Sequence, residues 1–141
     1  MNNKEKVVAF FDNLIFEQID LVDDFYAKDA VFIDPLIEVD SASKIKNYYS
    51  KLYEAVIEIS FDYGNFVQES DKVTMEWVMN LKATGLKSGK LINVPGISII
   101  KFNGEGKATY HRDYYDMGEF VYENVPILNM VIFFIKEKLA H

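Results

Sequence analysis

Hydrophobic and polar residues follow two different periods along this chain, and the change falls near residue 56. In the first part, apolar residues recur three and four positions apart, which is typical of helices with one buried side. Two helices are predicted to begin at N-caps Asp20 and Ser43, on either side of the extended segment "AVFIDP" at residues 30–35. An earlier helix is predicted from the stripe Val7, Phe10, Phe11, Leu14 and Ile15.

After residue 56 the pattern alternates from one residue to the next, as in strands with one buried face. The motif "NGEG" at 103–106 predicts a hairpin, and Pro95-Gly96 predicts a β-bulge. A bulge leaves the register beyond it open, so the inward residues are either Ile97 and Ile99 or Ser98 and Ile100. The predicted strands are "VIEISFDYGNFVQES", "VTMEWVMNLKA", "LINVPGISIIKF" and "KATYHRDYYD".

The last part of the chain is predicted to be helical again. Asp116 followed by Glu119 is a capping pattern, and Pro126 suits the first turn of a final helix. This apolar helix is expected to pack over the sheet or at a contact between subunits. The order of elements predicts an α+β fold in one domain, residues 1–141, with helices on one face of a strongly curved antiparallel or mixed sheet.

Composition and charge exclude several classes of protein. A net charge of −7 disfavours nucleic acid and anionic membrane surfaces as partners. The chain has no cysteine and only two histidines, His111 and His141, so we expect no disulfide and no metal site. The chain contains no glycine-rich loop of the kind that binds phosphate groups, so we expect no cofactor. The apolar run "VPILNMVIFFI" is shorter than the roughly 20 residues of a membrane span, and "MNNKEKVVAFF" lacks a cleavable signal, so we expect a cytoplasmic protein.

The stretch "YHRDYYD", Tyr110 to Asp116, concentrates titratable groups in one strand. Strand alternation places His111, Asp113 and Tyr115 on one face of the sheet and their neighbours on the other. Such a row is either a solvated strand edge or a set of side chains that line a pocket.

Three stretches together resemble the nuclear transport factor 2-like superfamily, in its SnoaL-like branch: "FYAKDAVFIDP", "FNGEGKATYHRDYYD" and "VYENVPILNMVIFFIK". This superfamily includes ketosteroid isomerases, limonene epoxide hydrolase and polyketide cyclases. The resemblance implies a cystatin-like cone around a deep apolar pocket that holds a small hydrophobic molecule. It also implies a homodimer formed through the sheet.

The resemblance also suggests roles for single residues. Asp113 matches the catalytic acid of limonene epoxide hydrolase, which points into the pocket, and His111 is placed to tune it. Asp34 in "DAVFIDP" is similar to the general base of ketosteroid isomerase. The structural alternatives are that Asp113 only shapes the cone and that Asp34 is a turn residue before Pro35.

Other positions depart from both families. Phe10 and Ser98 stand approximately where ketosteroid isomerase has its two hydrogen-bond donors, and Trp77 and Met79 replace a middle-strand Arg and Asp of the epoxide hydrolase. By alternation, Met75, Trp77 and Met79 share a strand face, which is either a pocket wall or a packed core stripe. The predicted ligand-binding residues are Trp77, Met79, Met75, Tyr115, Phe10 and Ser98.

Two classes of function follow from these residues. The first is a cofactor-independent isomerase, cyclase or hydrolase that uses an aspartate acid/base on a small hydrophobic substrate. The second is a protein without catalysis, either a binder of a small hydrophobic ligand or a protein–protein module.

Overall fold

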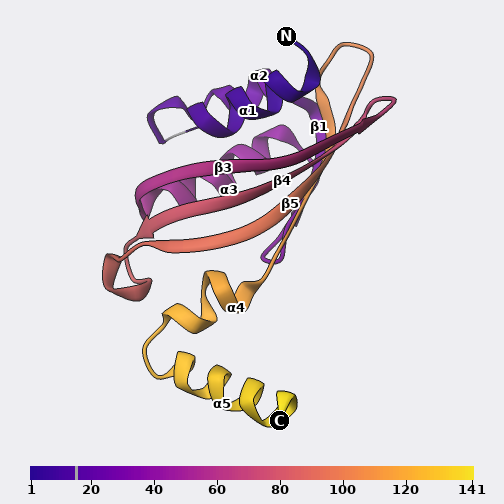
Figure 1. Cartoon of the computed structure of the whole chain (residues 1–141). Coiled ribbons are helices and arrows are strands. Elements are labelled where there is room, and N and C mark those ends of the chain that lie inside the picture. Colours follow the sequence, from indigo (N-terminus) through magenta and orange to yellow (C-terminus); the bar gives the residue numbers. More distant parts are fainter. Residues whose placement is uncertain (15) are drawn as a thin grey trace.

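The fold was analysed in a computed structural model, which describes residues 1–14 and 16–141 (Figure 1). The predicted place of Ile15 in the first helix lies outside the described residues. The α-helices are α1 (Asn3–Asn13), α2 (Leu21–Phe25), α3 (Ala42–Glu54), α4 (Met117–Phe120) and α5 (Leu128–Ala140). Short 3₁₀ turns are η1 (Phe16–Gln18), η2 (Lys87–Gly89) and η3 (Tyr122–Asn124). The strands are β1 (Tyr26–Ile33), β2 (Glu38–Val39), β3 (Val56–Glu69), β4 (Lys72–Ala83), β5 (Ile92–Phe102) and β6 (Ala108–Tyr115).

The strands form one six-stranded sheet in the order β2-β1-β6-β5-β4-β3. β1 and β6 run parallel, whereas the other neighbouring pairs are antiparallel, so the sheet is mixed. The parallel pairing of β1 with β6 places Phe32, in the first strand, beside His111, in the last strand. This topology confirms the predicted α+β class, and the "NGEG" turn joins β5 to β6 as predicted.

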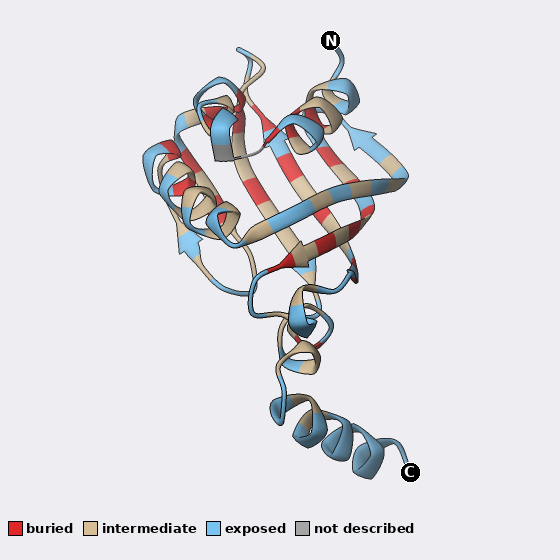
Figure 2. Cartoon of the chain, turned by 90° about the vertical axis from the view of Figure 1, so that its left-hand side faces the viewer, coloured by how far each residue is buried: buried red, intermediate tan, exposed pale blue. Residues whose placement is uncertain are grey.

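The helices α1, α2 and α3 cover one face of the curved sheet (Figure 1). Figure 2 shows the buried positions of the strands beneath these helices. Strict alternation creates this core: every second residue of β4 is buried, namely Val73, Met75, Trp77, Met79, Leu81 and Ala83. In β5 the buried set contains Ser98 and Ile100, which resolves the open register.

Two predicted helix starts need correction. α3 is capped by Ser41, whose Oγ accepts a hydrogen bond from the Lys44 backbone N–H at 3.1 Å, and not by Ser43. Ser41 has the extended backbone that an N-cap requires, whereas Ser43 already lies inside the helix. The final helix begins at Leu128, so Pro126 precedes its first turn. The predicted cap at Asp116 is confirmed, because its carboxylate accepts from the Gly118 N–H at 2.6 Å.

The predicted bulge at Pro95-Gly96 is wrong. The register between β4 and β5 runs without interruption through this dipeptide, with Trp77 opposite Gly96. The indole of Trp77 crosses the Gly96 backbone, and a Cβ at residue 96 would lie only 2.6 Å from Cζ3 of the ring. The glycine is therefore required for a close approach within a regular strand.

α5 does not pack over the sheet. It extends away from the cone (Figures 1 and 2), and none of its residues is buried. Phe134 is 62% exposed and Met130 is 70% exposed. Lys136 links α5 to η3 through Glu123 at 2.5 Å. In the parts of the chain that the structure describes, no helix combines the length and apolar character needed to cross a membrane. The alternative prediction, a contact between subunits, stays a prediction.

We predict that Gly96→Ala displaces the Trp77 indole and destabilises the fold by about 1–3 kcal/mol, as overpacked cores do. The new methyl group overlaps the ring, so Trp77 must leave its place. Trp77 is the only tryptophan, so its fluorescence reports this movement while urea denaturation reports the stability.

Gly104→Ala is the matched control, since an added Cβ there meets nothing within 4 Å. It should leave both the fluorescence and the stability unchanged. Equal effects from the two substitutions would contradict the assigned contact.

Candidate active site

A cavity of about 280 Å³ lies between the helices and the sheet. Its wall is mainly apolar, and two carboxylates, Asp34 and Asp113, reach it from different strands. The lining includes many aromatic rings, which are Phe10, Phe11, Tyr49, Tyr53, Phe61, Trp77, Tyr115 and Phe120. The two predicted acidic residues therefore share one pocket, a point that the sequence leaves open.

Asp113 is held through one of its two carboxylate oxygens. Oδ1 accepts a hydrogen bond from Ser98 Oγ at 2.5 Å and another from His111 Nε2 at 2.6 Å. Within the described residues Oδ2 has no hydrogen-bond partner, and no buried side-chain oxygen of that part is left unpaired. Oδ2 is thus open to the cavity, while Oδ1 fixes the orientation of the group.

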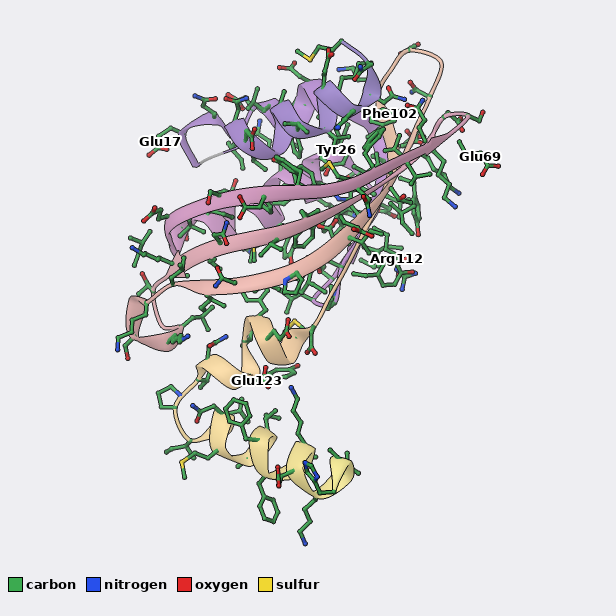
Figure 3. The ribbon with its side chains drawn as sticks, viewed as in Figure 1. Glu17, Tyr26, Glu69, Phe102, Arg112 and Glu123 are labelled. Carbon is green, nitrogen blue, oxygen red and sulfur yellow. The ribbon has the colours of Figure 1, made fainter. Side chains whose placement is uncertain are left out.

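A chain of buried donors stands behind Asp113. His111 is fully buried, and its Nδ1 lies 2.6 Å from the hydroxyl of Tyr26, which lies 3.3 Å from the hydroxyl of Tyr49. With Tyr49 donating to Tyr26 and Tyr26 donating to Nδ1, the imidazole carries its proton on Nε2 and donates it to Asp113. Burial raises the pKa of Tyr26 well above 10.0, so this phenol keeps its proton. Figure 3 shows Tyr26 between helices and sheet, with Arg112 on the other face.

A second chain reaches the same oxygen from the sheet. Trp77 Nε1 donates to Ser98 Oγ at 2.9 Å, and Ser98 in turn donates to Asp113. Ser98 is fully buried, so its hydroxyl has a fixed place in β5. Asp113 is therefore oriented from both sides, by His111 and by Ser98, through the same oxygen.

Asp34 has a different environment, since both of its oxygens are occupied. Oδ1 accepts from the backbone N–H groups of Leu36 and Ile37 at 2.8 and 3.0 Å, in the tight turn before β2. Oδ2 accepts from Tyr48 at 2.5 Å and, more weakly, from Tyr115 at 3.4 Å. Burial raises the pKa of Asp34 above 3.8, while the hydrogen bonds from Tyr48 and the turn oppose the rise. Asp34 is therefore both a turn residue, as the structural alternative predicted, and part of the pocket wall.

The structure separates the predicted binding residues into two groups. Trp77, Met79, Tyr115 and Phe10 line the cavity. Met75 lies in the core and does not reach the cavity, and Ser98 contacts it only through Asp113. His111 likewise stands behind Asp113 and does not form part of the wall.

Three residues of the site were not among the predicted catalytic or ligand-binding residues, although the helix face with Tyr49 and Tyr53 was expected at the core and the rim of the pocket. Tyr26 and Tyr49 extend the chain behind His111, and Tyr53 lines the cavity with a hydroxyl that has no hydrogen-bond partner among the described residues. Helical periodicity places Tyr49 and Tyr53 on one side of α3, four residues apart, and this spacing was the available signal. Tyr26 gave no such signal, because its partner lies 85 residues away.

Comparison with known proteins identifies the family. Residues 7–111 match the SnoaL-like domain, and the chain belongs to this family. The match ends at His111, so Asp113 and Tyr115 lie just beyond the matched segment. The cyclase aurE of Calcarisporium arbuscula is 25% identical over 99 residues, which cover 68% of this chain and 73% of that protein.

Solved structures show the same fold at low sequence identity. A protein with a ketosteroid isomerase-like fold from Catenulispora acidiphila, in complex with trimethylamine, is 17% identical with a TM-score of 0.73, covering 89% of this chain and 94% of that one. A structure from Jannaschia sp. CCS1 that is described as a SnoaL-like polyketide cyclase, without an established activity, is 17% identical with a TM-score of 0.71, covering 82% of this chain and 85% of that one. The predicted nuclear transport factor 2-like fold is therefore confirmed.

We predict that Asp34 titrates above 3.8 when its carboxyl carbon is followed by NMR. Because the folded pKa is raised, protonated Asp34 favours the folded state. That contribution is complete below the unfolded pKa and is lost as pH rises through the folded pKa. Tyr48→Phe removes a hydrogen bond that lowers this pKa, so the midpoint should move further up. A midpoint at or below 3.8, or a downward movement in Tyr48→Phe, contradicts the assigned causes.

Proposed function

We propose that the protein is a cofactor-independent acid–base enzyme that removes a proton next to a carbonyl group of a small apolar substrate. The observation that carries the proposal is Asp113, whose Oδ1 is fixed by Ser98 and His111 while Oδ2 is open to the cavity. A carboxylate that is oriented, partly desolvated and free at one oxygen is suited to general base catalysis.

The proposed reaction begins when Asp113 Oδ2 takes a proton from the carbon beside the carbonyl. The C–H electron pair becomes the C=C bond of an enolate, and the carbonyl π pair moves onto oxygen. In an isomerisation, the substrate has a double bond between its β and γ carbons, so the enolate is conjugated; protonated Asp113 returns the proton to the γ carbon, and the double bond moves to the α,β position. In a cyclisation, the enolate carbon attacks a second carbonyl of the same molecule, and Asp113 protonates the resulting alkoxide.

The enolate oxygen requires a hydrogen-bond donor, and two phenols of the cavity are candidates. Tyr53 has a hydroxyl without a partner in the described chain, and Tyr115 makes only a 3.4 Å contact with Asp34. Burial, and then the charge of Asp113, raise the pKa of Tyr53, and burial also raises that of Tyr115. Both phenols therefore remain protonated donors at neutral pH.

The cavity limits the size of the substrate. Small-molecule pockets span about 300–1,000 Å³, and this one, at about 280 Å³, suits one or two rings better than a four-ring steroid. The similarity to cyclase aurE favours cyclisation over epoxide hydrolysis, and the structural neighbour described as a SnoaL-like polyketide cyclase suggests a short polyketide-like chain as substrate.

A second candidate is a binder without turnover. Phe10 supplies no donor where ketosteroid isomerase has one, and its ring is stacked on Phe25 at 4.2 Å. The structural neighbour from Catenulispora acidiphila holds trimethylamine, a small amine. In this case Asp113 would orient a ligand without transferring a proton.

The test is proton exchange into small cyclic ketones and 1,3-diketones in D₂O, followed by ¹H NMR. The wild-type protein should accelerate loss of the signal of the protons beside the carbonyl for at least one compound. Asp113→Asn should reduce the rate by about 10²–10⁴-fold, the range of general base catalysis.

Asp29→Asn is the control, because Asp29 is exposed on β1, lies outside the cavity wall and changes the net charge equally. The Asp29→Asn protein should catalyse proton exchange into the ketone at the wild-type rate. Binding of a ketone, seen by quenching of Trp77, without any exchange would favour the binder and contradict the enzyme proposal.

A further inference from the structure

We infer that the ligand of this cavity carries a positive charge, as an apolar amine or quaternary ammonium compound. The inference rests on the proposed function only because both concern the same cavity. It adds the chemical class of the molecule that enters this cavity. Three features of the cavity support it: its carboxylates, its rings, and the lack of cationic side chains among the described residues of its wall.

The cavity contains acidic side chains without basic ones. Asp34 and Asp113 both line it, whereas none of the described residues in its wall is Lys, Arg or His. Among the described residues, His111 bonds Asp113 through Nε2 from behind and is not part of the cavity wall. Two like charges in one apolar cavity repel each other, and the charge of Asp113 contributes to raising the pKa of Asp34. A cationic ligand relieves this repulsion, whereas an anionic one increases it.

The wall of the cavity is also unusually rich in aromatic rings. Cations bind over the faces of Trp, Tyr and Phe, and quaternary ammonium groups are typically held in cages of such rings. Trp77, Tyr53 and Tyr115 lie in the same wall as Asp113. The rings can therefore add a cation–π attraction that an aliphatic wall would not supply.

The rings of the cavity have no cation from the described chain over them. All five cation–π contacts recorded there involve rings outside the cavity wall, which are Phe66, Phe102, Tyr110, Tyr114 and Phe134. Within the described residues, no side-chain cation therefore competes with a ligand for the rings that line the cavity. The net charge of −7 also attracts cations from solution.

The two carboxylates contribute differently. Both oxygens of Asp34 are saturated by hydrogen bonds, so it supplies charge without a free acceptor. Asp113 keeps Oδ2 free on the cavity side, and its other oxygen is fixed by Ser98 and His111. Asp113 is therefore the carboxylate whose removal should most reduce the preference for a cation.

The test compares choline with 3,3-dimethylbutan-1-ol, which has the same shape and no charge. Binding of each is measured at low, constant ionic strength by quenching of Trp77, the only tryptophan, and by calorimetry. Choline should bind at least about tenfold more tightly than the alcohol, as expected for a desolvated cation over aromatic rings. Equal or tighter binding of the alcohol overturns the inference, as does failure of both compounds to bind.

Two variants separate the cavity from the general field of the protein. Asp113→Asn should remove most of the preference for choline while it leaves the affinity for the alcohol unchanged. Asp29→Asn changes the net charge equally from an exposed position and should keep the preference. A preference for choline that survives in Asp113→Asn, or that is lost in Asp29→Asn, overturns the inference.

This experiment is independent of turnover, because neither probe has a carbonyl group. The inference therefore fails if the alcohol binds as well as choline, even when Asp113-dependent proton exchange is observed. The proposed enzyme function fails if exchange is absent, even when choline binds as expected.

Discussion

The site depends on one close contact inside the sheet, where the Trp77 indole crosses the backbone of Gly96. β4 and β5 pair without interruption here, and only a residue without Cβ leaves room for the ring. In this position Trp77 Nε1 reaches Ser98, which holds Asp113 Oδ1. The absence of a side chain at Gly96 thus helps to orient the carboxylate of Asp113, which lies two strands away from Trp77.

The second support of Asp113 connects the two layers of the fold. His111 in β6 bonds Tyr26 at the start of β1, and Tyr26 is in contact with Tyr49 in α3. Buried polar networks of this kind stabilise a unique arrangement only when every member is satisfied, and no buried side-chain N or O atom of the described residues lacks a partner. The network therefore fixes the position of α3, and with it the Tyr53 phenol, relative to Asp113.

The sequence predicted the layers well because amphipathic periods follow directly from burial. Helices α1 and α3 and the long strands come from such patterns, and the family resemblance added that His111, Asp113 and Tyr115 face the pocket. Pro95-Gly96 was misread, because the dipeptide itself is typical of a bulge and the decisive partner, Trp77, lies on another strand. Local pattern also predicted that α5 is a helix, but not that its apolar surface stays exposed.

The proposed charge of the ligand and the proposed proton transfer constrain each other. An ammonium group beside Asp113 Oδ2 would make the carboxylate a weaker base, but the same positive charge would stabilise an enolate in the cavity. The two requirements are compatible if the ammonium group lies over the aromatic rings of the wall, where it is attracted by the charge of Asp113 without contacting Oδ2. A carbonyl compound with its amine a few bonds from the reacting carbon satisfies both requirements. The unequal hydrogen bonding of the two carboxylates then makes Asp113, with its free Oδ2, both the base and the main attraction for the cation, while the occupied oxygens of Asp34 leave it a secondary role.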